Sequence, residues 1–166
     1  MRGKGAALAS SIAVAALLAP MASAGAGLGG AQSGAKAASL NACKLLKNSE
    51  VVKAIGEPVA SKRGGSSATG AKYCNWYGAD KRVAQKGITL IAAKDFAKLR
   101  FKKYKKQLNA NKPVKGVGDV AATDGQVLIA RIGDHRFVYV SPLNSHSGIT
   151  LDALKPLARK ALNRIP

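Results

Sequence analysis

Two cysteines behind an export-type segment constrain the fold of this chain more than any other feature. Cys43 and Cys74 are the only cysteines in the sequence. Disulfides form and persist outside the cytoplasm, where a pair of exported cysteines is expected to be oxidised. We therefore predict a Cys43–Cys74 disulfide, and closing a loop of this length should stabilise the fold by about 3–4 kcal/mol.

The N-terminal segment has the three parts of a secretory signal peptide. Arg2 and Lys4 supply positive charge, residues 6–19 are small and apolar, and residues 22–24 (Ala-Ser-Ala) offer the small side chains that a signal peptidase requires. The apolar run is shorter than the roughly 20 residues that span a bilayer. We predict that residues 1–24 are a signal peptide, that the protein is secreted to the cell envelope, and that no transmembrane span remains after cleavage.

Lipidation of the first cysteine is the alternative to the disulfide. Residues 40–43 (Leu-Asn-Ala-Cys) faintly match a bacterial lipobox, whose cysteine becomes acylated. The match lies far beyond the apolar run, and Asn41 is unfavourable in that position. Acylation of Cys43 would also leave Cys74 as an unpaired thiol in an oxidising compartment. These points favour the disulfide.

The remaining chain divides into a linker and a domain. Residues 25–38 are rich in Gly, Ala and Ser, which predicts a flexible lead-in. Residues 39–166 have the length of one globular domain.

Hydrophobic periodicity predicts an α+β fold. In the first half of the domain we expect two short helices in 39–56, a polar loop over 61–70, and strands over 72–77 and 87–93. A central helix follows, with Asp95 as its N-cap, and ends at about residue 108. In the second half we expect strands over 120–123, 126–132 and 136–141, and a closing helix over 151–165. This order of helix, strands, helix, strands and helix predicts a mainly antiparallel sheet with helices packed on it. Alternation in the first strand puts Cys74 and Trp76 on one face, and Tyr73 and Tyr77 on the other.

Several short motifs resemble an uncharacterised family of exported actinobacterial proteins, many of them lipoproteins. The motifs are residues 41–46 (NACKLL) and 49–56 (SEVVKAIG), the Cys74-Asn75-Trp76 strand, residues 117–121 (VGDVA) and residues 157–162 (LARKAL). The resemblance implies an extracytoplasmic domain bridged between its first helix and the Cys-x-Trp strand. It implies no activity. The chain departs from the family in lacking a convincing lipobox.

The charge balance is strongly basic. The chain has 27 Lys and Arg against 8 Asp and Glu, a net charge of +19, and loss of Arg2 and Lys4 with the signal lowers it by two, to +17. Such a protein attracts polyanions, with a strength that falls as salt rises. Outside a cell these are wall polymers, anionic lipid head groups and stray nucleic acid, and no motif indicates specific nucleic-acid binding. Solubility is the alternative role of the charge.

The central predicted helix concentrates this charge. Its candidate anion-binding residues are Lys98, Lys102, Lys103, Lys105 and Lys106. The buried stripe of the same helix is predicted to be Ala97, Phe101, Tyr104 and Leu108. The lysines could bind phosphate or carboxylate groups, or the helix could dip Phe101 and Tyr104 into lipid. An ordinary solvated helix face is the alternative.

No catalytic, metal or cofactor site is predicted. His135 is expected in a hairpin turn, and His146 lies between Ser145 and Ser147 in a loop without a nucleophile-elbow motif. The residues 63–66 (Arg-Gly-Gly-Ser) lack the strand-to-helix context of a phosphate-binding loop.

Three functional hypotheses follow. The leading one is a secreted, non-enzymatic binding module that recognises an anionic cell-envelope polymer or a protein partner through its basic surface. The second is a structural or inhibitory protein that acts through its sheet face, where Tyr73 or Tyr77 would matter more than the lysines. The third is a small hydrolase that uses His146.

Overall fold

The structure is a computed structural model that describes residues 39–80 and 86–166. The predicted signal peptide (1–24) and lead-in (25–38) lie outside the described residues.

One antiparallel sheet organises the described part of the chain. Its seven strands follow the order β1-β2-β3-β7-β6-β5-β4, and every neighbouring pair is antiparallel. The strands are β1 (Val59–Ser66), β2 (Lys72–Gly78), β3 (Gly87–Ala93), β4 (Lys112–Pro113), β5 (Val120–Thr123), β6 (Leu128–Ile132) and β7 (Arg136–Pro142). The predicted α+β class and element order are confirmed.

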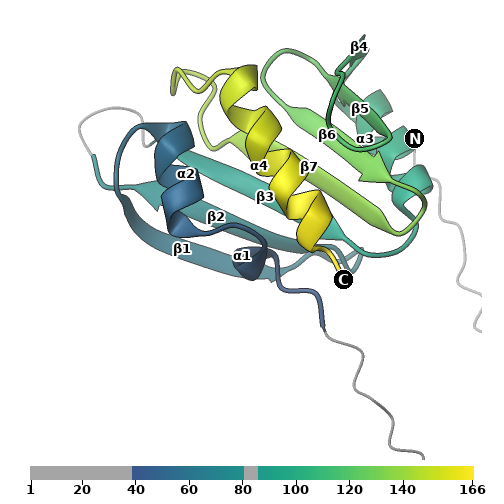
Figure 1. Cartoon of the computed structure of the whole chain (residues 1–166), viewed down its shortest axis with the longest axis horizontal. Helices are drawn as coiled ribbons and strands as arrows, with labels where there is room; N and C mark the ends of the chain where they lie inside the picture. Colours follow the sequence, from purple (N-terminus) through teal and green to yellow (C-terminus); the bar gives the residue numbers. More distant parts are fainter. Residues whose placement is uncertain (1–38, 81–85) are drawn as a thin grey trace, which may run out of the picture. The chain divides into compact units, whose positions relative to one another are not determined.

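The four helices cover the two faces of the sheet unequally. Helices α1 (Ala42–Leu45), α2 (Asn48–Ile55) and α4 (Leu151–Arg164) lie on one face, and α3 (Ala97–Gln107) lies on the other (Figure 1). The side chains of α3 pack over β6 and β7. Ala93 and the partly buried Ile91 of β3 belong to the same cluster as the α3 side chains Ala97 and Phe101.

Alternation in β2 directs the disulfide and the only tryptophan into the larger core. Cys74 and Trp76 have no exposed surface, and both lie in the core cluster under α1, α2 and α4. Their neighbours in the same cluster include Ile88 and Leu90 of β3. The predicted sharing of a face by Cys74 and Trp76 is confirmed.

The polar loop predicted over residues 61–70 is wrong for residues 61–66, which belong to strand β1, whereas residues 67–70 form a turn. Strand β1 pairs only with β2, so it is an edge strand, and nearly all of its residues are exposed. An edge strand with few buried side chains needs no hydrophobic alternation, so its sequence carries no strand signal. The absence of a side chain at Gly64 has a structural reason, because a Cβ atom there would lie 2.6 Å from the Sγ atom of Cys43.

The N-terminus of α3 is capped by a distant residue and not by Asp95. The Asp134 carbonyl accepts a hydrogen bond from the Ala97 N–H (3.0 Å), and its Oδ1 atom accepts one from the Lys98 N–H (2.8 Å). Phe96 occupies the N-cap position and makes no side-chain cap. The cap comes from the β6–β7 hairpin because the fold brings this turn against the start of α3.

A charged cluster joins α2 to α4. The Glu50 carboxylate accepts two hydrogen bonds from Arg164 (2.7 and 2.8 Å), one from the Lys47 N–H (2.9 Å), and lies 3.1 Å from Lys160 Nζ. Its side chain is only 10% exposed. The hydrogen bonds from Arg164, with those from Lys47 and Lys160, lower the pKa of Glu50 from 4.5 to about 2, although burial acts in the opposite direction.

We expect Glu50→Gln to lower the free energy of unfolding by about 1–2 kcal/mol near neutral pH, because Arg164 is partly exposed and solvent screens the pair. A lowered folded pKa means that this stability is present above the unfolded pKa, and is lost as pH falls from about 4.5 to about 2. Urea unfolding of both proteins across this range should show the difference closing.

Asp152→Asn is the matched control, because it removes an exposed ion pair to Lys155 in α4. It should change the unfolding midpoint little. A difference between Glu50→Gln and the wild type that stays constant down to about pH 2 would contradict the linkage argument.

Candidate functional site

Helix α3 carries the five predicted lysines, and its buried side chains pack it against the sheet. Ala97 and Phe101 are buried, and the half-buried Tyr104 packs its ring against Phe137 and Tyr139, with centroid distances of 5.3 and 5.6 Å. Desolvation at this position raises the pKa of Tyr104 above 10.0. These contacts confirm the predicted stripe. The prediction that Phe101 and Tyr104 could dip into lipid is wrong, because both face the sheet.

All five candidate lysines are exposed: Lys98, Lys102, Lys103, Lys105 and Lys106. Within residues 39–80 and 86–166, their ammonium groups make no ion pair. Because successive helical residues turn by about 100°, Lys102 and Lys106 lie one turn apart on the outer side, with Lys98 and Lys105 on one flank and Lys103 on the other. We refer to these five residues as the lysine surface.

A shallow apolar hollow borders the lysine surface. It has a volume of about 300 Å³ and is lined by Thr69, Phe96, Leu99, Arg100, Lys103, Tyr104 and Gln107. Arg100 fixes one side of it, because its guanidinium donates to the Thr69 carbonyl (2.9 Å) and to the Asp95 carbonyl (3.2 Å). This hydrogen bonding ties the β1–β2 turn to the first turn of α3.

Sequence reasoning missed the two apolar residues of this hollow. Phe96 and Leu99 are each 66% exposed. Leu99 does carry a signal in the sequence, because it lies about 200° around the helix from Ala97 and therefore outside the buried stripe. The exposure of Phe96 has no such signal in the sequence, because the outward direction of its side chain depends on a backbone conformation that only the folded structure reveals.

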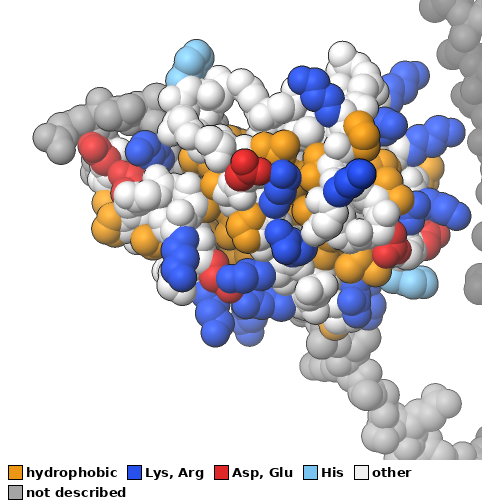
Figure 2. Space-filling view, turned by 45° about the horizontal axis from the view of Figure 1, so that its top comes forward, with side chains coloured by type: hydrophobic (Ala, Val, Ile, Leu, Met, Phe, Trp, Pro, Cys, Tyr) orange, Lys and Arg blue, Asp and Glu red, His pale blue; other side chains and the backbone are white. Residues whose placement is uncertain are grey.

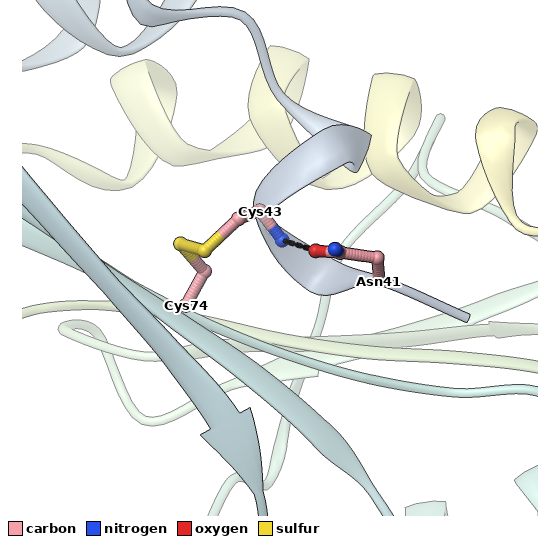
Figure 3. The surroundings of a disulfide bond; sticks show 3 residues. All are labelled: Asn41, Cys43 and Cys74. Atoms are coloured by element: carbon pink, nitrogen blue, oxygen red, sulfur yellow. Dashed lines mark hydrogen bonds between the residues drawn. A yellow bond between two sulfur atoms is a disulfide. The ribbon is translucent and has the colours of Figure 1, made fainter. Parts of the chain in front are cut away.

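The predicted disulfide is present. It joins Cys43 of α1 to Cys74 of β2, with Cα atoms 5.1 Å apart, and Asn41 Oδ1 accepts a hydrogen bond from the Cys43 N–H (3.0 Å) (Figure 3). The Cys43 sulfur is therefore occupied and is not free for acylation. A second hollow of about 410 Å³ lies beside the bond and is lined partly by Gly64, Lys72 and Tyr73.

The histidine loop does not assemble the arrangement of a serine hydrolase. Ser145 Oγ lies 3.3 Å from His146 Nδ1, and the His146 N–H donates to Asn144. Among the described residues, no carboxylate hydrogen-bonds to the His146 ring. His135 lies in the β6–β7 turn, outside this loop, and its Nδ1 atom is 3.5 Å from Asp95.

No group of three potential metal ligands occurs in the described ranges, 39–80 and 86–166. None of the helices in this part of the chain is both long and apolar enough to cross a membrane.

The sheet face beside α3 carries the tyrosines of the second hypothesis. Tyr73, Asn75 and Tyr77 of β2 are half-buried on this face. The buried Asn75 Oδ1 atom has no hydrogen-bond partner in the part of the chain that the structure describes.

Positive charge is not confined to α3. Figure 2 shows Lys and Arg side chains spread over the face that includes α4, with few acidic side chains among them. The lysine surface differs from this background in the exposed apolar side chains of Phe96 and Leu99 beside it.

Comparisons of the chain with protein-family models, with curated proteins and with solved structures find no match in any of the three. The resemblance to exported actinobacterial proteins stays a prediction. The functional argument therefore rests on the geometry of this site.

Proposed function

We propose that the protein is a secreted, non-enzymatic binding module whose lysine surface recognises an anionic polymer of the cell envelope. The observation that supports this proposal is the density of charge on one short helix. Five ammonium groups extend from eleven residues of α3, and no described acid neutralises them. Export through the predicted signal peptide would bring this surface to wall polymers and membrane head groups.

The chemistry of lysine suits a repetitive ligand. An ammonium is a compact point charge on a flexible stem, so it attracts phosphate or carboxylate without requiring the fixed geometry that arginine imposes. Several such charges on one rigid helix can engage successive charges of a polymer together, which raises the overall affinity. The affinity of such a site should fall as salt rises.

We expect Lys102→Glu/Lys106→Glu to weaken binding of long-chain polyphosphate by at least about tenfold, because it reverses charge at the centre of the lysine surface. Labelled polymer is titrated with the exported protein at two salt concentrations, and the fluorescence anisotropy of the polymer gives the binding affinity. The matched control is Lys44→Glu/Lys62→Glu, which changes the net charge equally on α1 and β1. It should weaken binding much less.

Equal weakening by both double variants would contradict a localised site, because it would show that only net charge matters. Retention of full affinity by Lys102→Glu/Lys106→Glu would refute the proposal. If Tyr73→Ala or Tyr77→Ala abolished binding while the lysine changes did not, the sheet face would be the binding surface.

A further inference from the structure

Two large apolar side chains protrude beside the lysine surface. Phe96 and Leu99 are each 66% exposed and line the same hollow, so they form a contiguous apolar protrusion. Isolated exposed hydrophobic residues are ordinary on protein surfaces, but adjacent ones mark interaction sites more often. The only other well-exposed large hydrophobic side chain in the described ranges is that of Val120, at 38%, and it does not line this hollow.

The backbone holds this protrusion outward. Phe96 has φ 58° and ψ 32°, in the left-handed region that a bulky residue seldom adopts. Strain of this kind persists only where surrounding contacts enforce it, and such residues concentrate at functional sites. Here the enforcing contacts are the two hydrogen bonds from the first turn of α3 to Asp134 and the bond from Arg100 to the Asp95 carbonyl.

The charge around the protrusion is predominantly positive. Lys98, Lys102 and Lys103 lie within one turn of Leu99, and Arg100 adds a further cation. Two acids are also close. The Asp134 carboxylate is engaged by the Lys98 N–H, and Asp95 lies 3.5 Å from His135.

We propose that the first two turns of α3 seat on an anionic phospholipid bilayer, with Phe96 and Leu99 entering the interface and the lysine surface facing the head groups. Apolar side chains flanked by lysines match the layered chemistry of that interface, in which acyl chains lie beneath anionic groups. A purely soluble polyanion offers nothing for Phe96 and Leu99 to contact. This inference rests on the proposed function, because the same lysines supply the attraction to anions.

The test compares vesicles with a soluble polyanion. Phe96→Asn/Leu99→Gln removes both apolar side chains with little risk to the fold, since Asn tolerates left-handed backbone and Gln is a good helix former. We expect this variant to bind vesicles of phosphatidylglycerol and phosphatidylcholine about 30- to 100-fold more weakly than the wild type does, and to bind polyphosphate equally well. Co-sedimentation of the exported protein with the vesicles measures the affinity for the bilayer. Fluorescence anisotropy of labelled polymer measures the affinity for polyphosphate.

Two further variants serve as controls. Val120→Thr changes an exposed apolar side chain elsewhere and should leave vesicle binding unchanged. Lys102→Glu/Lys106→Glu should weaken binding to both ligands. Leu99→Trp adds a direct readout, because the only native tryptophan, Trp76, is fully buried. The emission of the new indole should shift to the blue when anionic vesicles are added.

The outcomes separate the two proposals. Unchanged vesicle binding by Phe96→Asn/Leu99→Gln, or an unshifted emission of Leu99→Trp, would overturn the membrane inference. Equal binding to pure phosphatidylcholine would also overturn it, because the lysines would then play no part. A wild type that binds polyphosphate but no vesicle would refute the inference and leave the proposed function standing, whereas failure to bind either ligand would refute both.

Discussion

Trp76→Ala is expected to lower the free energy of unfolding by about 3–5 kcal/mol, the largest stability effect that we predict for a single substitution. Trp76 is fully buried in the core beneath α1, α2 and α4. It stands opposite Ile88 of β3 and Lys62 of β1 in the sheet. Removing its ring opens a cavity that the sheet, paired on both sides of β2, cannot readily close. Denaturant unfolding followed by circular dichroism measures the loss, since the variant lacks the only tryptophan.

Trp76→Phe separates the volume of this side chain from its polar atom. The Trp76 Nε1 group is buried without a hydrogen-bond partner among the described residues. Phenylalanine removes that unsatisfied donor and keeps most of the ring, so the cost should stay below about 1.5 kcal/mol. A Trp76→Phe variant as unstable as Trp76→Ala would contradict this account, because it would mean that the indole N–H is paired in solution.

The second large effect is expected from Cys43→Ala/Cys74→Ala, which should lower the free energy of unfolding by about 3–4 kcal/mol. The two cysteines are 31 residues apart, and the loop that they close contains α2 and β1. Without the bond, the unfolded chain gains the conformations that the loop excluded. Guanidinium unfolding monitored by Trp76 fluorescence should show a lower midpoint and a slightly steeper dependence on denaturant, because the unlinked chain exposes more surface.

Reduction of the wild type provides the matched measurement. The reduced protein and the double alanine variant should unfold at similar denaturant concentrations, since both lack the cross-link. If the two cysteines proved to be free thiols in the exported protein, or if the double variant unfolded like the wild type, the bond would not be a source of stability.

Local sequence patterns predicted those parts of the fold in which neighbouring residues decide the structure. Alternation around Cys74 and Trp76 indicated which side chains enter the core, and this depends only on the two-residue period of a strand. The hairpins between β5, β6 and β7 are also local features, because their turns contain Gly125 and Gly133, which adopt positive φ there.

Features of the fold that depend on contacts between distant residues could not be predicted from local sequence patterns. Strand β1 exists because β2 offers it an edge, and its exposed residues need no hydrophobic pattern. Asp134 caps α3 from 37 residues away in the chain, so the nearby Asp95 was the wrong expectation. Helical spacing likewise showed which stripe of α3 is buried, but not that α3 and α4 lie on opposite faces of the sheet.

Some features of the candidate site could likewise be predicted from the local sequence, and others could not. Exposure of Lys98, Lys102 and the other three lysines follows from helical geometry, because the apolar stripe determines which side faces the sheet. The protrusion of Phe96 does not, because its left-handed conformation is imposed by the β6–β7 turn and by Arg100.

The sequence alone determined the fold class, the cysteine pairing and the side of α3 that is charged, since each depends on composition or on periodicity over a few residues. Only the tertiary structure decided which strand closes the edge of the sheet, which residue caps α3 and which apolar side chains stand beside the lysines. These depend on contacts between segments far apart in the chain, and such contacts leave no periodic trace in either segment.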